Sequence, residues 1–151
     1  MQDRTTEIFL RVRENFADVR EKVSLIKPYF ELMCFTTAWA LKLEEFKKIL
    51  GFTPEFLYES KEQVYAISVL YRVDDDITTA VIAHEFAQIV AREQNISDHE
   101  HIDEICVQRG FGEQLLYSLE NDLLTGMSDR DFVLREGLSA RIENLKRILK
   151  K

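Results

Sequence analysis

Three histidines lie close together in this chain, and the first of them stands beside a glutamate. His84, His99 and His101 are the only histidines in the sequence and fall within 18 of its 151 residues. The pair His84-Glu85 is followed by Gln88 inside an apolar run. On a helix, a histidine in place of Gln88 would put two imidazoles on one face, where they could bind Zn²⁺. Glu85 would then be placed to deprotonate a metal-bound water.

A second interpretation of these residues needs no metal. Apolar residues surround most of the predicted helix, so polar side chains inside it require partners. His84 and Gln88 could hydrogen-bond each other or nearby backbone, while Glu85 reaches water at a groove. An amide oxygen is a weak ligand for Zn²⁺ compared with imidazole. Gln88 should therefore lower zinc affinity unless His99 or Asp103 compensates.

The segment from about Ser97 to Gly110 could supply a further ligand. Ser97 and Glu100 have the spacing of a helix capping box, and Gly110 fits the end of that helix. At 100° per residue, His99 and Asp103 stack on one face of this helix. The inward stripe is predicted to contain Ile102, Ile105, Cys106 and Arg109, with Glu100 and Glu104 pointing away.

The register between the two helices gives a different answer. In an antiparallel helical hairpin centred near Ile96, Gln88 would lie level with Asp103, and His99 would lie nearer the loop. The facing argument and the register argument therefore differ about which residue approaches the His84 helix. Both alternatives stay open from sequence alone.

The rest of the chain predicts an α+β fold in which helix predominates. Apolar spacing, caps and β-favouring runs give the order helix, helix, hairpin and then four helices. The predicted elements are helices Thr6–Ile26 and Leu41–Leu50 (closed by Gly51), a hairpin of Glu55–Tyr58 with Val64–Val73, and helices Ile77–Glu93 (capped by Asp74 to Asp76), Ser97–Gly110, Glu113–Leu124 and Asp131–Leu149. No composition break or repeat divides the chain, so residues 1–151 are predicted to form a single domain.

Composition narrows the choice of partners and compartment. The net charge of −7 disfavours nucleic acid, and no apolar stretch approaches the length of a membrane span. The first residues contain no apolar signal segment, which predicts a soluble, cytoplasmic protein. Cys34 and Cys106 are too few for a disulfide framework, so both are predicted to be small buried hydrophobic residues.

The strand, the acidic turn and the Ala83-His84-Glu85-Phe86-Ala87-Gln88 segment together resemble the gluzincin metallopeptidases, in particular the single-domain minigluzincins. The resemblance covers about Val64 to Gly112, with HExxQ in place of HExxH. It implies a small zincin-like domain with a short sheet, an edge strand that can pair with a peptide, and a following helix that donates an acidic ligand. In that family a glutamate ligand is often followed four residues later by a supporting aspartate. His99 and Asp103 match that spacing, with histidine at the glutamate position.

Two functions follow from this resemblance. The first is a zinc-dependent metallopeptidase, in which Glu85 is the catalytic base and His84, Gln88, His99 and Asp103 are the candidate zinc ligands. The second is an inactive pseudo-peptidase that binds a peptide or protein segment through an edge strand such as Val64–Val73. A chance His-Glu pair in an ordinary α+β domain is the third alternative. The sequence leaves the oligomeric state open.

Overall fold

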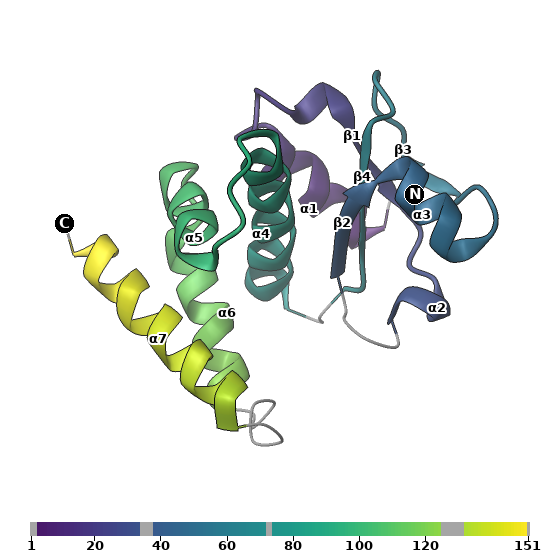
Figure 1. The fold of residues 1–151 in the computed structure, drawn as a ribbon. Helices are drawn as coiled ribbons and strands as arrows, with labels where there is room; N and C mark the ends of the chain where they lie inside the picture. Colours follow the sequence, from purple (N-terminus) through teal and green to yellow (C-terminus); the bar gives the residue numbers. More distant parts are fainter. Residues whose placement is uncertain (1–2, 34–37, 72–73, 125–131, 151) are drawn as a thin grey trace.

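The chain adopts an α+β fold, as predicted. The structure is a computed structural model and describes residues 3–33, 38–71, 74–124 and 132–150. Those residues form seven α-helices and one mixed sheet of four strands (Figure 1). None of the helices described is long and apolar enough to cross a membrane.

The sheet contains β1 (Val23–Ile26), β2 (Ala38–Lys42), β3 (Phe56–Tyr58) and β4 (Tyr65–Val69) in the order β2-β4-β1-β3. β1 and β4 are parallel, and the other two pairs are antiparallel. The predicted hairpin is therefore wrong, because β1 lies between β3 and β4. Local β-propensity located both strands, but it carries no information about a partner from an earlier part of the chain.

β1 also corrects the prediction of a long N-terminal helix over Thr6–Ile26. The observed helix, α1, spans only Arg4–Arg13 and begins at Asp3, whose side chain accepts a hydrogen bond from Thr6 N. A short 3₁₀ turn at Arg20–Lys22 follows before β1 begins. All four residues of β1 are buried, and such strands are short apolar runs that can coincide with helical spacing.

The next predicted helix, Leu41–Leu50, is close to its observed position, and a further short helix that was not predicted precedes it. α2 covers Phe30–Met33, in a segment that the sequence did not classify, and α3 covers Leu43–Leu50. Gly51 closes α3 with φ of 81°, the left-handed conformation expected at a helix C-terminus. Leu41, which was assigned to this helix, belongs to β2 instead.

The described part of the C-terminal half contains only helices and the short connections between them. It contains α4 (Asp75–Glu93), α5 (His99–Gln108), α6 (Gly112–Leu124) and α7 (Phe132–Leu149). Asp74 caps α4 as predicted, and its side chain accepts from Ile77 N at 3.0 Å. The cap of α5 is Asp98 and not the predicted Ser97, because the Asp98 side chain accepts from His101 N. Gly110 follows α5 with φ of 95°.

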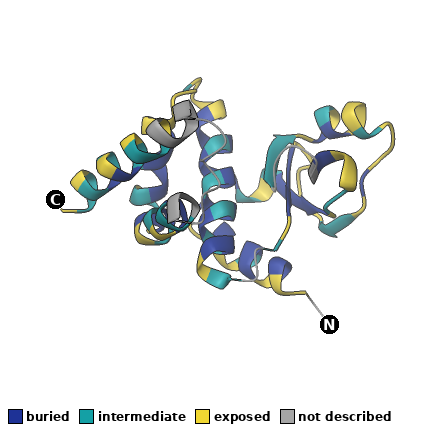
Figure 2. Cartoon of the chain, turned by 90° about the horizontal axis from the view of Figure 1, so that it is seen from below, coloured by how far each residue is buried: buried dark blue, intermediate teal, exposed yellow. Residues whose placement is uncertain are grey.

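α4 is the central helix of the molecule. It packs against α1, α5, α6, β2 and β4, and dark buried segments run along its length in Figure 2. α1 and α4 lie on the same side of the sheet, α5 and α6 cover the side of α4 that faces away from the sheet, and α7 packs against α5 and α6 (Figure 1). The exposed residues of α4 lie near its two ends, and His84 and Gln88 in its middle are partly exposed.

Candidate functional site: a groove over α4

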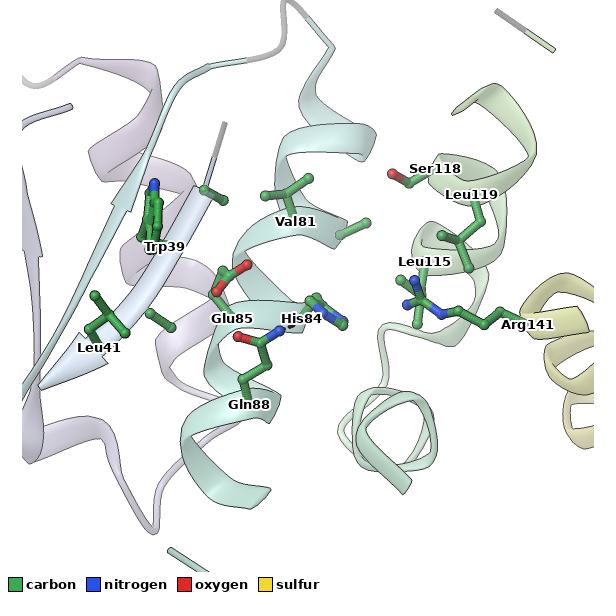
Figure 3. A pocket seen from close by; sticks show the side chains of 13 residues that line it. Trp39, Leu41, Val81, His84, Glu85, Gln88, Leu115, Ser118, Leu119 and Arg141 are labelled. Carbon is green, nitrogen blue, oxygen red and sulfur yellow. Dashed lines mark hydrogen bonds between the residues drawn. The ribbon is translucent and has the colours of Figure 1, made fainter. Parts of the chain in front are cut away.

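A groove with a volume of about 480 Å³ lies between β2 on one side and α6 and α7 on the other. α4 forms its floor and contributes His84, Glu85 and Gln88 (Figure 3). Ser118 of α6 and Arg141 of α7 line the opposite wall. α6 runs beside α4 in the opposite direction, since Val81 lies level with Ser118 and His84 with Leu115 in Figure 3.

The wall on the sheet side is the edge strand β2. Ala38 and Ala40 pack toward the main core that contains α4, whereas Trp39 packs with the smaller cluster on the other face. This alternation follows from the two-residue period of a strand. Two methyl side chains facing α4 leave room for the groove.

The backbone N–H and C=O groups of β2 also point alternately toward β4 and away from it. Leu43 N donates to Val64 O, and hydrogen-bonded pairs alternate along an antiparallel ladder. Trp39 and Leu41 are therefore the residues of β2 whose backbone groups hydrogen-bond to β4. The N–H and C=O groups of Ala38 and Ala40 point toward the outer edge of the sheet, where no strand in the described part of the chain pairs with β2. The predicted edge strand, Val64–Val73, is wrong in this respect, because β4 pairs with β2 on one side and β1 on the other.

The imidazole of His84 is held by Gln88. Gln88 Nε2 donates to His84 Nε2 at 3.0 Å, which places the ring hydrogen on Nδ1. His84 Nδ1 is buried without a hydrogen-bond partner and lies 3.9 Å from Asp103 Oδ1. The pKa of His84 is lowered to about 4, mainly by burial of the ring and also by the nearby charge of Arg141. The ring is therefore neutral at physiological pH, and its approach to Asp103 is not an ion pair.

α5 brings both of its candidate residues to His84. The rings of His84 and His99 stack with centroids 6.1 Å apart, and Asp103 approaches from the same helix face. The prediction that His99 and Asp103 lie on one face of this helix therefore describes the contact correctly. The hairpin register, which placed His99 nearer the loop, is wrong in this respect, because His99 at the start of α5 already lies beside His84.

Arg141 pairs with the buried carboxylate of Asp103. Arg141 Nε donates to Asp103 Oδ2 at 3.0 Å, and Nη2 donates to Oδ1 at 2.8 Å. The Asp103 side chain is 1% exposed and the Arg141 side chain is 24% exposed. This bidentate geometry is the strongest form of a carboxylate–guanidinium contact. The sequence interpretation missed Arg141; its only signal was a cation beside the apolar stripe of α7.

Among the residues that the structure describes, Glu85 is the only acidic one that lines the groove. It is 7% exposed, and among the described residues it has no hydrogen-bond or ion-pair partner. Burial raises the pKa of Glu85 to about 7. In Figure 3 its carboxylate points toward β2, away from His84 and Arg141. Glu85 and the His84–Gln88 pair therefore occupy different parts of the same groove.

Replacing Glu85 with glutamine should stabilise the protein at alkaline pH. The folded chain keeps the Glu85 proton up to a pKa of about 7, against 4.5 ordinarily, so the stability linked to this proton is present at acid pH and is lost as pH rises through 7. We expect Glu85→Gln to raise the free energy of unfolding by about 2 to 3 kcal/mol near pH 8.5 and to leave it unchanged near pH 4. Urea titrations at both pH values measure this difference.

Glu44→Gln is the matched control for that measurement, because Glu44 is exposed on α3 close to the end of β2. Its substitution should change the stability by less than about 0.5 kcal/mol at either pH. An equal response of both variants would show that Glu85 has an ordinary pKa.

The donor set does not fit a zinc ion. Both oxygens of Asp103 accept from Arg141, and the Nε2 atom of His84 is occupied by the Gln88 amide. His99 is exposed at the start of α5. In the described part of the chain, no three His, Cys, Asp or Glu side chains form a group that could hold a metal ion.

The two cysteines differ in what the structure describes. Cys106 is fully buried and unpaired, and burial raises the pKa of its thiol, so it is a packing residue as predicted. Cys34 lies outside the described residues.

Comparison with known proteins gave no match: no family model, curated protein or solved structure is similar to this chain.

Proposed function

We propose that this chain is a peptide-binding module that adds an extended segment to the free edge of β2. The observation that carries this proposal is the groove beside that edge, which is lined by the methyl groups of Ala38 and Ala40. An unpaired strand edge presents N–H and C=O groups that another extended chain can satisfy. The floor of the groove offers Glu85, and the far wall offers Ser118 and Arg141, as polar contacts for its side chains.

In this proposal, the resemblance to gluzincins concerns the arrangement of strand and helix and not zinc-dependent catalysis. An edge strand beside a His-Glu helix is what that resemblance implies, and binding along the strand requires no metal. Gln88, the departure from the family motif, holds His84 by a hydrogen bond. A pseudo-peptidase of this kind would have kept the peptide-binding surface of the fold without the zinc ligands.

A substitution that fills the groove should abolish peptide binding. Ala40→Leu places a larger side chain on the α4-facing side of β2, so a short capped threonine–alanine peptide should lose at least about tenfold in affinity. Two-dimensional NMR of the labelled protein measures this, with the amides of Ala38 and Ala40 expected to shift saturably in the wild type. Ala17→Leu, which adds the same side chain at an exposed alanine outside the groove, is the matched control and should bind normally.

Backbone pairing can be separated from simple filling of the groove by N-methylation of the peptide. Methylating alternate residues removes the N–H groups that face β2 in one phase and those that face away in the other. We expect only one phase to weaken binding. Equal affinity of both methylated peptides would exclude strand addition.

The alternative function, zinc-dependent hydrolysis, is supported by the raised pKa of Glu85 in a groove beside His84. It can be tested at Gln88. Gln88→His would place two imidazoles on one helix face and should raise zinc affinity by about a hundredfold. Calorimetric titration with zinc chloride measures the gain.

Gln94→His, at the exposed end of α4, controls for a surface histidine and should leave zinc affinity unchanged. A different result would favour the enzyme: stoichiometric zinc in the wild type, together with peptide cleavage that Glu85→Gln abolishes without loss of metal. If Gln88→His gains nothing, the resemblance to gluzincins has no basis in metal chemistry.

A further inference from the structure

We infer that the segment bound along β2 presents a cationic group, an ammonium or guanidinium, to the carboxylate of Glu85. This inference rests on the proposed peptide-binding function and names the chemistry of its ligand. Glu85 is more than nine-tenths buried, lines the groove and has no partner among the described residues. A buried carboxylate without a partner is costly, and a bound cation would supply the missing charge.

The charges around the groove favour a cation over an anion. Arg141 is already neutralised by its bidentate contact with Asp103, and the low pKa of His84 leaves that ring neutral. Above its pKa of about 7, Glu85 is therefore the only described groove residue whose charge has no partner. The whole chain also carries a net charge of −7, which attracts basic segments over longer range.

The geometry places Glu85 within the reach of a strand added to β2. Side chains of an added strand alternate between the two faces of the sheet, so every second one would face α4, as Ala38 and Ala40 do. The Glu85 carboxylate points toward β2 and away from Arg141 (Figure 3). A long flexible stem, as in lysine or arginine, would carry the charge from the strand edge down to the floor of the groove.

The test compares capped threonine–alanine peptides that differ only in the central residue: lysine, norleucine or glutamate. The lysine peptide should bind the wild type about tenfold to a hundredfold more tightly than the norleucine peptide, with the glutamate peptide weakest. Glu85→Gln should abolish this preference, whereas Glu44→Gln, which removes an equal but exposed charge, should retain it. A norleucine peptide with a free N-terminus distinguishes a terminal ammonium from a side-chain ammonium as the source of the cation.

The outcomes separate the two proposals. If the norleucine and lysine peptides bind wild type and Glu85→Gln equally, strand addition stands and the cation inference is wrong. Tightest binding of the glutamate peptide would also overturn the inference and would identify Arg141 as the anchor. If none of the peptides shifts the amides of Ala38 and Ala40, the proposed function itself fails, and the inference fails with it.

Discussion

Replacing Arg141 with methionine should lower the free energy of unfolding by about 3 to 5 kcal/mol, the cost of breaking one partner of a buried ion pair. Methionine keeps much of the apolar stem of arginine, so the loss falls on the guanidinium. The Asp103 side chain is 1% exposed and would keep a buried charge without its two donors. Chemical denaturation at neutral pH measures the loss.

Arg147→Met is the matched control on the same helix. Arg147 is 63% exposed and approaches Glu100 only at the surface, so its loss should cost less than about 1 kcal/mol. The double substitution Arg141→Met with Asp103→Leu should recover most of the stability, because it removes the uncompensated charge. A full loss in the double variant would mean that packing, and not charge, explains the effect of Arg141.

Arg141→Met should also change the ionisation of His84. Arg141 contributes to the lowering of the pKa of His84 to about 4, and Asp103 opposes it. Without Arg141, the remaining carboxylate faces His84 alone, so the pKa of the imidazole should move upward. NMR titration of the His84 ring provides a second measurement that a purely structural role of Arg141 would leave unchanged.

Local signals were sufficient to predict most helices. The α4 helix was predicted from its apolar positions and from the acidic cap at Asp74, and both hold in the structure. Gly51 and Gly110 mark helix ends because a left-handed residue there closes the last turn. Each of these signals lies within a few residues of the feature it predicts, so no long-range contact was needed.

Strand pairing could not be predicted in the same way. β1 pairs with β3 and β4, which lie more than thirty residues later in the chain by the register Leu25↔Tyr58 and Leu25↔Ile67. The sequence between β3 and β4 resembles a hairpin loop, and nothing in it reveals that another strand separates them. The residues of β1 were assigned to the predicted N-terminal helix because their apolar spacing fits the period of a helix as well as that of a buried strand.

The same difference between local and long-range contacts applies to the candidate site. The mutual contact of His84 and Gln88 could be predicted, since residues at i and i+4 meet on a helix. The facing of His99 and Asp103 followed from α5 alone. Arg141 could not be predicted, because it lies 38 residues from Asp103 and only tertiary packing of α7 brings the two together. That one contact changes Asp103 from a candidate ligand into half of an ion pair.

Phe86→Ala should also cost about 3 to 5 kcal/mol, for a reason independent of charge. Phe86 is fully buried on the side of α4 that faces α1. Its ring stacks on Phe16 with centroids 5.1 Å apart and lies 5.3 Å from Phe9. Alanine would leave a cavity among aromatic rings that cannot close without moving α1. Thermal or urea denaturation measures the loss.

Phe86→Leu and Phe52→Ala serve as controls. Leucine fills most of the space, so Phe86→Leu should cost clearly less than alanine, and Phe52, which is 46% exposed, should contribute under about 1 kcal/mol. A surface-like cost for Phe86→Ala would contradict the central position of α4.

Because Phe86 does not line the groove, the folded fraction of Phe86→Ala should still bind peptide with the affinity of the wild type. The opposite pattern is expected of Ala40→Leu, which should lose binding without comparable loss of stability. Together the two variants separate the side of α4 that holds the fold from the side that meets the ligand. If Phe86→Ala also abolished binding at a temperature where it remains folded, the shape of the groove would depend on the aromatic core, and Glu85 would have to be treated as part of that core and not as a free ligand-facing group.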